Sequence, residues 1–97
     1  MTVKVIGLME LTDQKAFELY RSKVGQTVEF YKGSIENRGT VTEVFWNELN
    51  CTRFGAFVEL TFPNQEDAKA WAHSREYQAL VAIRKEAMQL TLFAATI

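Results

Sequence analysis

Cysteine, proline and histidine are scarce in this 97-residue chain, which contains one of each. Cys51 has no second thiol with which to form a disulfide, and neither Cys51 nor His73 belongs to a cluster spaced for zinc. We therefore expect no disulfide and no metal site. Two interpretations of His73 stay open: an exposed residue at a helix junction, or a base that titrates near neutral pH.

The chain also lacks an excess of charge of either sign and any long apolar run. Eleven basic and twelve acidic side chains give a net charge of −1 and alternate along the sequence. Without a basic field, neither nucleic acid nor an anionic membrane is an expected partner. No stretch has the features of a membrane span or a signal peptide. No phosphate loop or nucleotide fingerprint is present, so no cofactor is expected. We predict one soluble, cytoplasmic domain over residues 1–97.

Four segments have the alternation of β-strands. The clearest is RFGAFVELTF, residues 53–62, in which every second side chain is apolar and Pro63 ends the run. The other three are residues 2–10, residues 34–38 with a possible extension through Phe45, and residues 89–97.

Two helical segments separate these strands. Thr12 or Asp13 caps the first, which ends between residues 25 and 31. Asn64 opens the second, and Ser74 caps its continuation. The resulting β-α-β-β-α-β order is that of the ferredoxin-like fold, an α+β class in which one four-stranded antiparallel sheet carries both helices on one face.

The sheet face opposite the helices is expected to mix large apolar side chains with charges of both signs. On strand 53–62 the apolar set must face the helices, so its other set lies on this face. For each of the other strands we assign the more polar set to this face. Besides Phe57 and Glu59, it then carries Lys4, Ile6, Leu8, Glu10, Glu36, Arg38 and Phe93. Such a face is typical of a sheet that closes on a second copy around a cleft. We therefore expect a homodimer.

Arg84 lies within an apolar helical arc that also contains Tyr77, Leu80, Val81 and Met88. In one interpretation its stem covers apolar surface while the guanidinium pairs with a carboxylate such as Glu76 or Glu59. In the other, the guanidinium binds an anionic group of a ligand, because an arginine among apolar neighbours needs a bidentate partner.

RNA binding is a weaker alternative. Strand 53–62 partly matches the RNP1 pattern of RNA recognition motifs at Arg53, Ala56, Phe57 and Val58. Gly55, however, stands where the first stacking aromatic is required. A single platform ring and a net charge of −1 supply neither the stacking nor the electrostatic attraction that RNA binding needs.

Two stretches, YKGSIENRG at 31–39 and ELTFPNQEDAKAWAHSREYQ at 59–78, together with Arg84, resemble a small bacterial family known as domain of unknown function 1330. The sequence departs from the family pattern at Lys32, Asn64 and Ala72. The resemblance implies a dimeric α/β barrel, in which two ferredoxin-like sheets pack face to face. Related barrels include cofactor-free oxygenases and lactone isomerases, so the fold admits enzymes without requiring one.

These observations predict a homodimer that binds a small anionic or carbonyl-bearing molecule in a pocket between sheet and helices. Any chemistry there would be cofactor-free acid/base chemistry. The alternative is a non-catalytic dimeric structural or interaction module. The expected ligand-binding residues are Arg38, Phe57, Trp71, Ser74, Tyr77 and Arg84.

Overall fold

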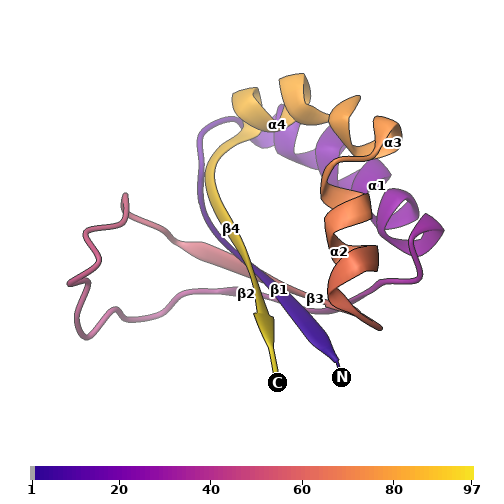
Figure 1. Cartoon of the computed structure of the whole chain (residues 1–97). Coiled ribbons are helices and arrows are strands. Elements are labelled where there is room, and N and C mark those ends of the chain that lie inside the picture. Colours follow the sequence, from indigo (N-terminus) through magenta and orange to yellow (C-terminus); the bar gives the residue numbers. More distant parts are fainter. Residues whose placement is uncertain (1) are drawn as a thin grey trace.

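The computed structural model describes residues 2–97 and has the predicted ferredoxin-like topology (Figure 1). Its elements are β1 (Val3–Leu11), α1 (Gln14–Phe30), β2 (Ser34–Thr40), β3 (Ala56–Phe62), α2 (Gln65–Ala72), α3 (Arg75–Gln78), α4 (Val81–Ala87) and β4 (Met88–Thr96). The strands form one antiparallel sheet in the order β2-β3-β1-β4. All four helices lie on the same side of this sheet (Figure 1). None of the helices in residues 2–97 has the length and apolar character that crossing a bilayer requires.

Side-chain caps start three of the helices where the sequence predicts them. Asp13 accepts a hydrogen bond from the backbone N–H of Ala16 at 2.9 Å, and Asn64 accepts one from Asp67 at 2.8 Å. Ser74 caps α3 in the same way. Such caps satisfy N–H groups that the first helical turn leaves without partners. The continuation after Ser74 is not one helix, however, because it breaks between α3 and α4.

The main core lies between the sheet and the helices, around Trp71. Its largest fully buried side chains are Trp71, Phe62, Val3 and Val28. The Trp71 ring lies 5.6 Å from that of Phe62 and 4.5 Å from that of Tyr77, measured between centroids. Aromatic rings at these separations add to the stabilisation that comes from burying their area.

A β-bulge in β2 reverses the face that Arg38 occupies. Ile35 pairs with Leu60 and Asn37 with Glu59, so Glu36 is an extra residue without a partner on β3. One added residue moves every later side chain to the opposite face. Arg38 consequently pairs with Val58 on the helix side of the sheet. The prediction that Arg38 lies on the face away from the helices was wrong for this reason.

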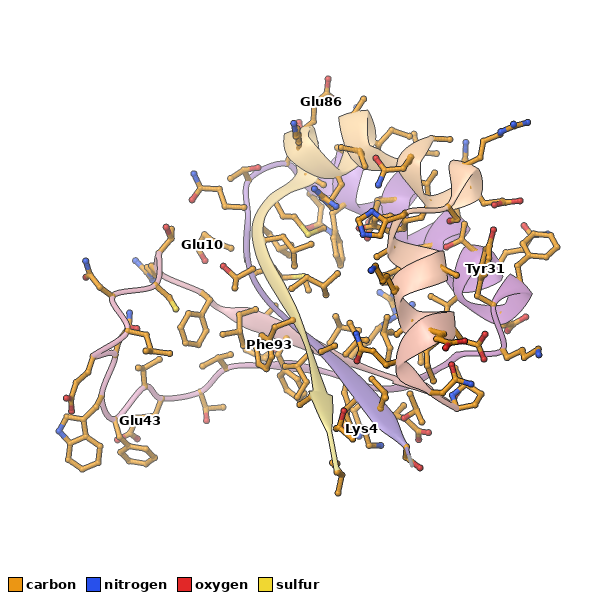
Figure 2. The ribbon with its side chains drawn as sticks, in the orientation of Figure 1. Lys4, Glu10, Tyr31, Glu43, Glu86 and Phe93 are labelled. Atoms are coloured by element: carbon orange, nitrogen blue, oxygen red, sulfur yellow. The ribbon has the colours of Figure 1, made fainter. Side chains whose placement is uncertain are left out.

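The sheet face away from the helices, called the open face below, combines an apolar centre with an ion pair. Its apolar side chains are Ile6, Leu8, Phe57 and Phe93, which the strand register brings together. Phe93, 45% exposed, lies on β4 (Figure 2). Beside this centre, Lys4 forms an ion pair of 3.3 Å with Glu59, and Asn37 donates to the same carboxylate at 2.7 Å. These contacts lower the pKa of Glu59, and the hydrogen bond from Asn37 has the largest effect.

Residues 41–55, the β2–β3 loop, extend away from the rest of the molecule (Figure 1). The loop carries Glu43, labelled in Figure 2, and four exposed apolar side chains. Trp46 is 81% exposed, and the others are Val44, Phe45 and Leu49. The possible extension of the second strand through Phe45 was wrong, because β2 ends at Thr40. Exposed apolar side chains gathered on one loop are a common feature of surfaces that contact another molecule.

Candidate functional site

A cavity of about 320 Å³ lies between α1 and the helix side of the sheet. Helix α1 contributes Phe17, Tyr20 and Val24, which are spaced at i, i+3 and i+7 and therefore share one helix face. The strands contribute apolar side chains to the opposite wall, among them Met9, Ile35, Ala56, Leu60, Met88 and Leu92. The volume is at the small end of the range for ligand pockets in proteins, which suits a molecule with one or two rings.

Two arginines stand where the cavity opens. The exposed residues of the lining are Leu11, Arg21, Arg38 and Thr40, so the mouth lies on their side. Among residues 2–97, no carboxylate forms an ion pair with Arg21 or Arg38. Partial burial, followed by the charge of Arg21, lowers the pKa of Arg38. The mouth is therefore a place where two positive charges repel each other without a protein anion between them.

Trp71 is a buried residue of the cavity lining whose polar atom is already engaged elsewhere. The indole N–H of Trp71 donates to the Thr27 hydroxyl at 3.0 Å, and that hydroxyl donates to the Val24 carbonyl at 2.7 Å. The only polar atom of the indole is thus already hydrogen-bonded. Trp71 consequently offers a ligand an apolar surface.

Tyr20 is the cavity residue that connects to Arg84. The hydroxyl oxygens of Tyr20 and Tyr77 are 2.9 Å apart, and Arg84 donates from Nη1 to the Tyr77 hydroxyl at 2.8 Å. The guanidinium carbon of Arg84 also lies 5.7 Å from the centre of the Tyr77 ring. Burial, with the neighbouring Tyr77 adding to it, raises the pKa of Tyr20 well above its usual range. Tyr20 therefore keeps its proton at neutral pH.

This geometry explains the arginine in the apolar helical arc. Arg84 has no ion pair with any carboxylate of residues 2–97, including Glu59 and Glu76, which were the partners expected in one interpretation. Glu76 instead accepts a hydrogen bond from Tyr31 at 2.8 Å. The partner of Arg84 is a buried tyrosine hydroxyl, which in turn contacts a residue of the cavity.

The structure brings some of the predicted site residues to the cavity and leaves others outside its lining. Arg38, Phe57 and Trp71 line it. The side chain of Phe57 nevertheless lies on the open face. Its partner on β2 is Gly39, and a Cβ added to Gly39 on that face would come within 2.5 Å of the Phe57 ring.

Tyr77 and Arg84 lie behind Tyr20, outside the lining. Ser74 also lies outside it, because its hydroxyl donates to the Trp71 carbonyl and accepts from the Tyr77 N–H. Tyr20 and Arg21 were missed as site residues. The signal in the sequence was a tyrosine inside the apolar arc of the first helix, because a buried hydroxyl needs a partner.

One family model matches nearly the whole chain. The family model described as "Domain of unknown function (DUF1330)" matches residues 3–96. The chain belongs to this family. The resemblance seen in residues 31–39 and 59–78 is thereby confirmed. No curated protein has a sequence that matches this chain.

Solved structures similar to this member of the family share its fold at low sequence identity. A protein of unknown function from Rhodopseudomonas palustris is 13% identical, with a TM-score of 0.78 over 99% of this chain and 82% of that one. A dimeric ferredoxin-like protein of unknown function from Jannaschia is 10% identical, with a TM-score of 0.68 over the full length of both chains. SnoaB, a cofactor-independent oxygenase from Streptomyces nogalater, is 7% identical, with a TM-score of 0.69 over 99% and 92% of the two chains. These likenesses show the fold alone.

Proposed function

We propose that the cavity binds a small molecule with an apolar body of one or two rings and an anionic or carbonyl group. The observation that carries this proposal is the pairing of an apolar cavity with a mouth that holds Arg21 and Arg38 without carboxylate partners. An anion at the mouth would relieve the repulsion between the two guanidinium groups, while the body of the molecule would contact Phe17, Trp71 and the strand side chains.

We propose further that the protein is a homodimer formed through the open face. Leu8 and Phe57 are paired neighbours at the centre of this face, and Phe93 lies beside them on β4. A second copy of the chain can cover this apolar face with its own, because a two-fold interface places the same patch of both subunits in contact. The Jannaschia neighbour and one from Bacteroides fragilis are described as dimeric, which supports this arrangement.

The β2–β3 loop supports the same assembly. It leaves the sheet at the ends of β2 and β3 and carries Phe45, Trp46 and Leu49 into solvent in the single chain. In a dimer built on the open face, the loop of each subunit extends from the edge of the shared sheets and can bury these side chains on its twin. The assembly would thus cover both of the large apolar surfaces that the single chain leaves exposed.

The mouth can be tested with 2-naphthoate, which has two fused rings and one carboxylate. We expect isothermal titration calorimetry to show saturable binding to the wild-type protein and binding about three- to ten-fold weaker to Arg38→Gln. The weakening follows from the loss of one charge-assisted hydrogen bond in a partly solvated place. The uncharged analogue 2-naphthamide should bind both proteins with similar affinity.

Arg75→Gln is the matched control, because Arg75 is an exposed arginine of α3 outside the cavity lining. It should bind 2-naphthoate as the wild type does. An absence of saturable binding to the wild type would refute the proposed function. Equal weakening by both substitutions would show that overall charge, not the mouth, attracts the anion.

A further inference from the structure

The direction of each hydrogen bond in the chain behind the cavity follows from which groups can donate and which are buried. The chain runs through Arg84, Tyr77 and Tyr20, joined by contacts of 2.8 and 2.9 Å. A guanidinium group only donates hydrogen bonds, so the Tyr77 oxygen must accept from Arg84. The direction of the second contact, between the two tyrosine hydroxyls, is then the open question.

The burial of Tyr77 answers that question. Tyr77 is 2% exposed and lies outside the cavity lining, and within residues 2–97 its hydroxyl contacts only Arg84 and Tyr20. If Tyr20 donated to Tyr77, the proton of the Tyr77 hydroxyl would be buried without an acceptor, which carries a full desolvation penalty. Tyr77 therefore donates to the Tyr20 oxygen.

In this arrangement the proton of the Tyr20 hydroxyl has no acceptor among residues 2–97. Tyr20 lines the cavity, and its hydroxyl has Tyr77 as its one hydrogen-bond partner among residues 2–97. With its oxygen already accepting from Tyr77, Tyr20 has a proton available for a molecule in the cavity. Each link polarises the next, because a donor whose own oxygen accepts a hydrogen bond becomes a stronger donor.

We propose that Tyr20 donates a hydrogen bond to a phenolate, enolate or carbonyl oxygen of the bound molecule, and that Arg84 strengthens this donor through Tyr77. This inference rests on the proposed function, because it assigns the inner contact of the same ligand. Tyr20 is then a ligand-binding residue, while Tyr77 and Arg84 are positioning residues that act through it. The ligand class is narrowed to molecules with an oxygen acceptor on an apolar ring system.

The buried state of Tyr20 agrees with a donor role. Burial raises the pKa of its hydroxyl, so Tyr20 does not compete as a base or as an anion at neutral pH. The absence of a carboxylate ion pair at Arg84 within residues 2–97 leaves the guanidinium charge unneutralised, so its full charge polarises the chain. A carboxylate beside Arg84 would have weakened this effect.

The ionisation of bound 4-nitrophenol tests the inference, because the phenolate form is yellow and the phenol is not. A hydrogen bond from Tyr20 stabilises the phenolate, so it lowers the pKa of the bound probe. We expect this pKa to be about one unit higher in Tyr20→Phe than in the wild type. Tyr77→Phe and Arg84→Met should shift it in the same direction by a smaller amount, because they weaken the donor without removing it.

Tyr31→Phe is the matched control. It also removes one tyrosine hydroxyl, which donates to Glu76 outside the cavity, and should leave the pKa of bound 4-nitrophenol unchanged. Circular dichroism melting of each variant checks the fold, and Tyr77→Phe provides a second test should Tyr20→Phe not fold.

The possible outcomes separate this inference from the proposed function. Binding of 4-nitrophenol to wild type and Tyr20→Phe with the same bound pKa would overturn the inference and leave the cavity as a ligand site. A shift in Tyr20→Phe alone, with none in Tyr77→Phe or Arg84→Met, would overturn the role of the chain behind it. Failure of the wild type to bind either 4-nitrophenol or 2-naphthoate would overturn both proposals.

Discussion

A Leu8→Glu variant is expected to be a monomer at concentrations at which we expect the wild-type chain to be a dimer. Leu8 lies at the centre of the open face, with Phe57 on one neighbouring strand and Thr91 on the other. In a two-fold interface a substitution enters twice, so two carboxylates would be buried close together in an apolar contact. Burying unpaired like charges costs several kcal/mol, on the order of the free energy that holds a typical dimer together.

Leu19→Glu is the control for this prediction. Leu19 is a leucine of α1 that is 45% exposed, and it lies on the helix layer instead of the open face. Analytical ultracentrifugation of the three proteins should find the wild type and Leu19→Glu as dimers and Leu8→Glu as a monomer. A wild-type protein that sediments as a monomer, or a Leu8→Glu variant that stays dimeric, would show that the open face is not the interface.

Trp71→Ala is expected to destabilise the protein by about 3–5 kcal/mol. Trp71 is 2% exposed and packs against the rings of Phe62 and Tyr77. Its removal leaves a void beside an existing cavity, and it also takes the hydrogen-bond donor away from the buried Thr27 hydroxyl. The loss is a large part of the stability of a domain of this size, so much of the variant should be unfolded at moderate urea concentrations.

The second tryptophan of the chain supplies the comparison. Trp46 lies on the β2–β3 loop and is 81% exposed, so Trp46→Ala should change the free energy of unfolding by less than about 0.5 kcal/mol when both tryptophan substitutions are made in the Leu8→Glu background, which we expect to be monomeric. Urea denaturation followed by far-ultraviolet circular dichroism measures both variants. Equal effects of the two substitutions would contradict the placement of Trp71 at the centre of the core.

The fold could be predicted from the sequence because local and global signals agree. The alternation in residues 53–62 predicts β3, although the strand begins only at Ala56, and Asp13, Asn64 and Ser74 each cap the helix that follows them. The bulge at Glu36 left no such signal, because an extra residue in a polar strand disturbs no apolar alternation. The face of Arg38 was consequently predicted wrongly, although Arg38 does line the cavity.

The candidate site and the β2–β3 loop were harder to predict than the fold, for three physical reasons. Tyr20 has the pattern of a core residue, and its hydroxyl, which lies opposite that of Tyr77 in the fold, is the one feature that sets it apart. Val44 and Phe45 were predicted as a possible extension of the second strand, because hydrophobicity in a sequence does not distinguish a buried strand from exposed apolar residues. The connection of Arg84 to the cavity through Tyr77 depends on a contact across the molecule, between α4 and α1 by way of α3.

The central claim, that the cavity behind Arg21 and Arg38 holds a ligand, can be tested with the methionine methyl groups. Met9 and Met88 both line the cavity. In a protein labelled with carbon-13 at the methionine methyls, the resonances of Met9 and Met88 should shift together and saturably as 2-naphthoate is added. Unchanged Met9 and Met88 signals, at concentrations of 2-naphthoate that saturate its binding in calorimetry, would place the ligand outside the cavity and contradict the account.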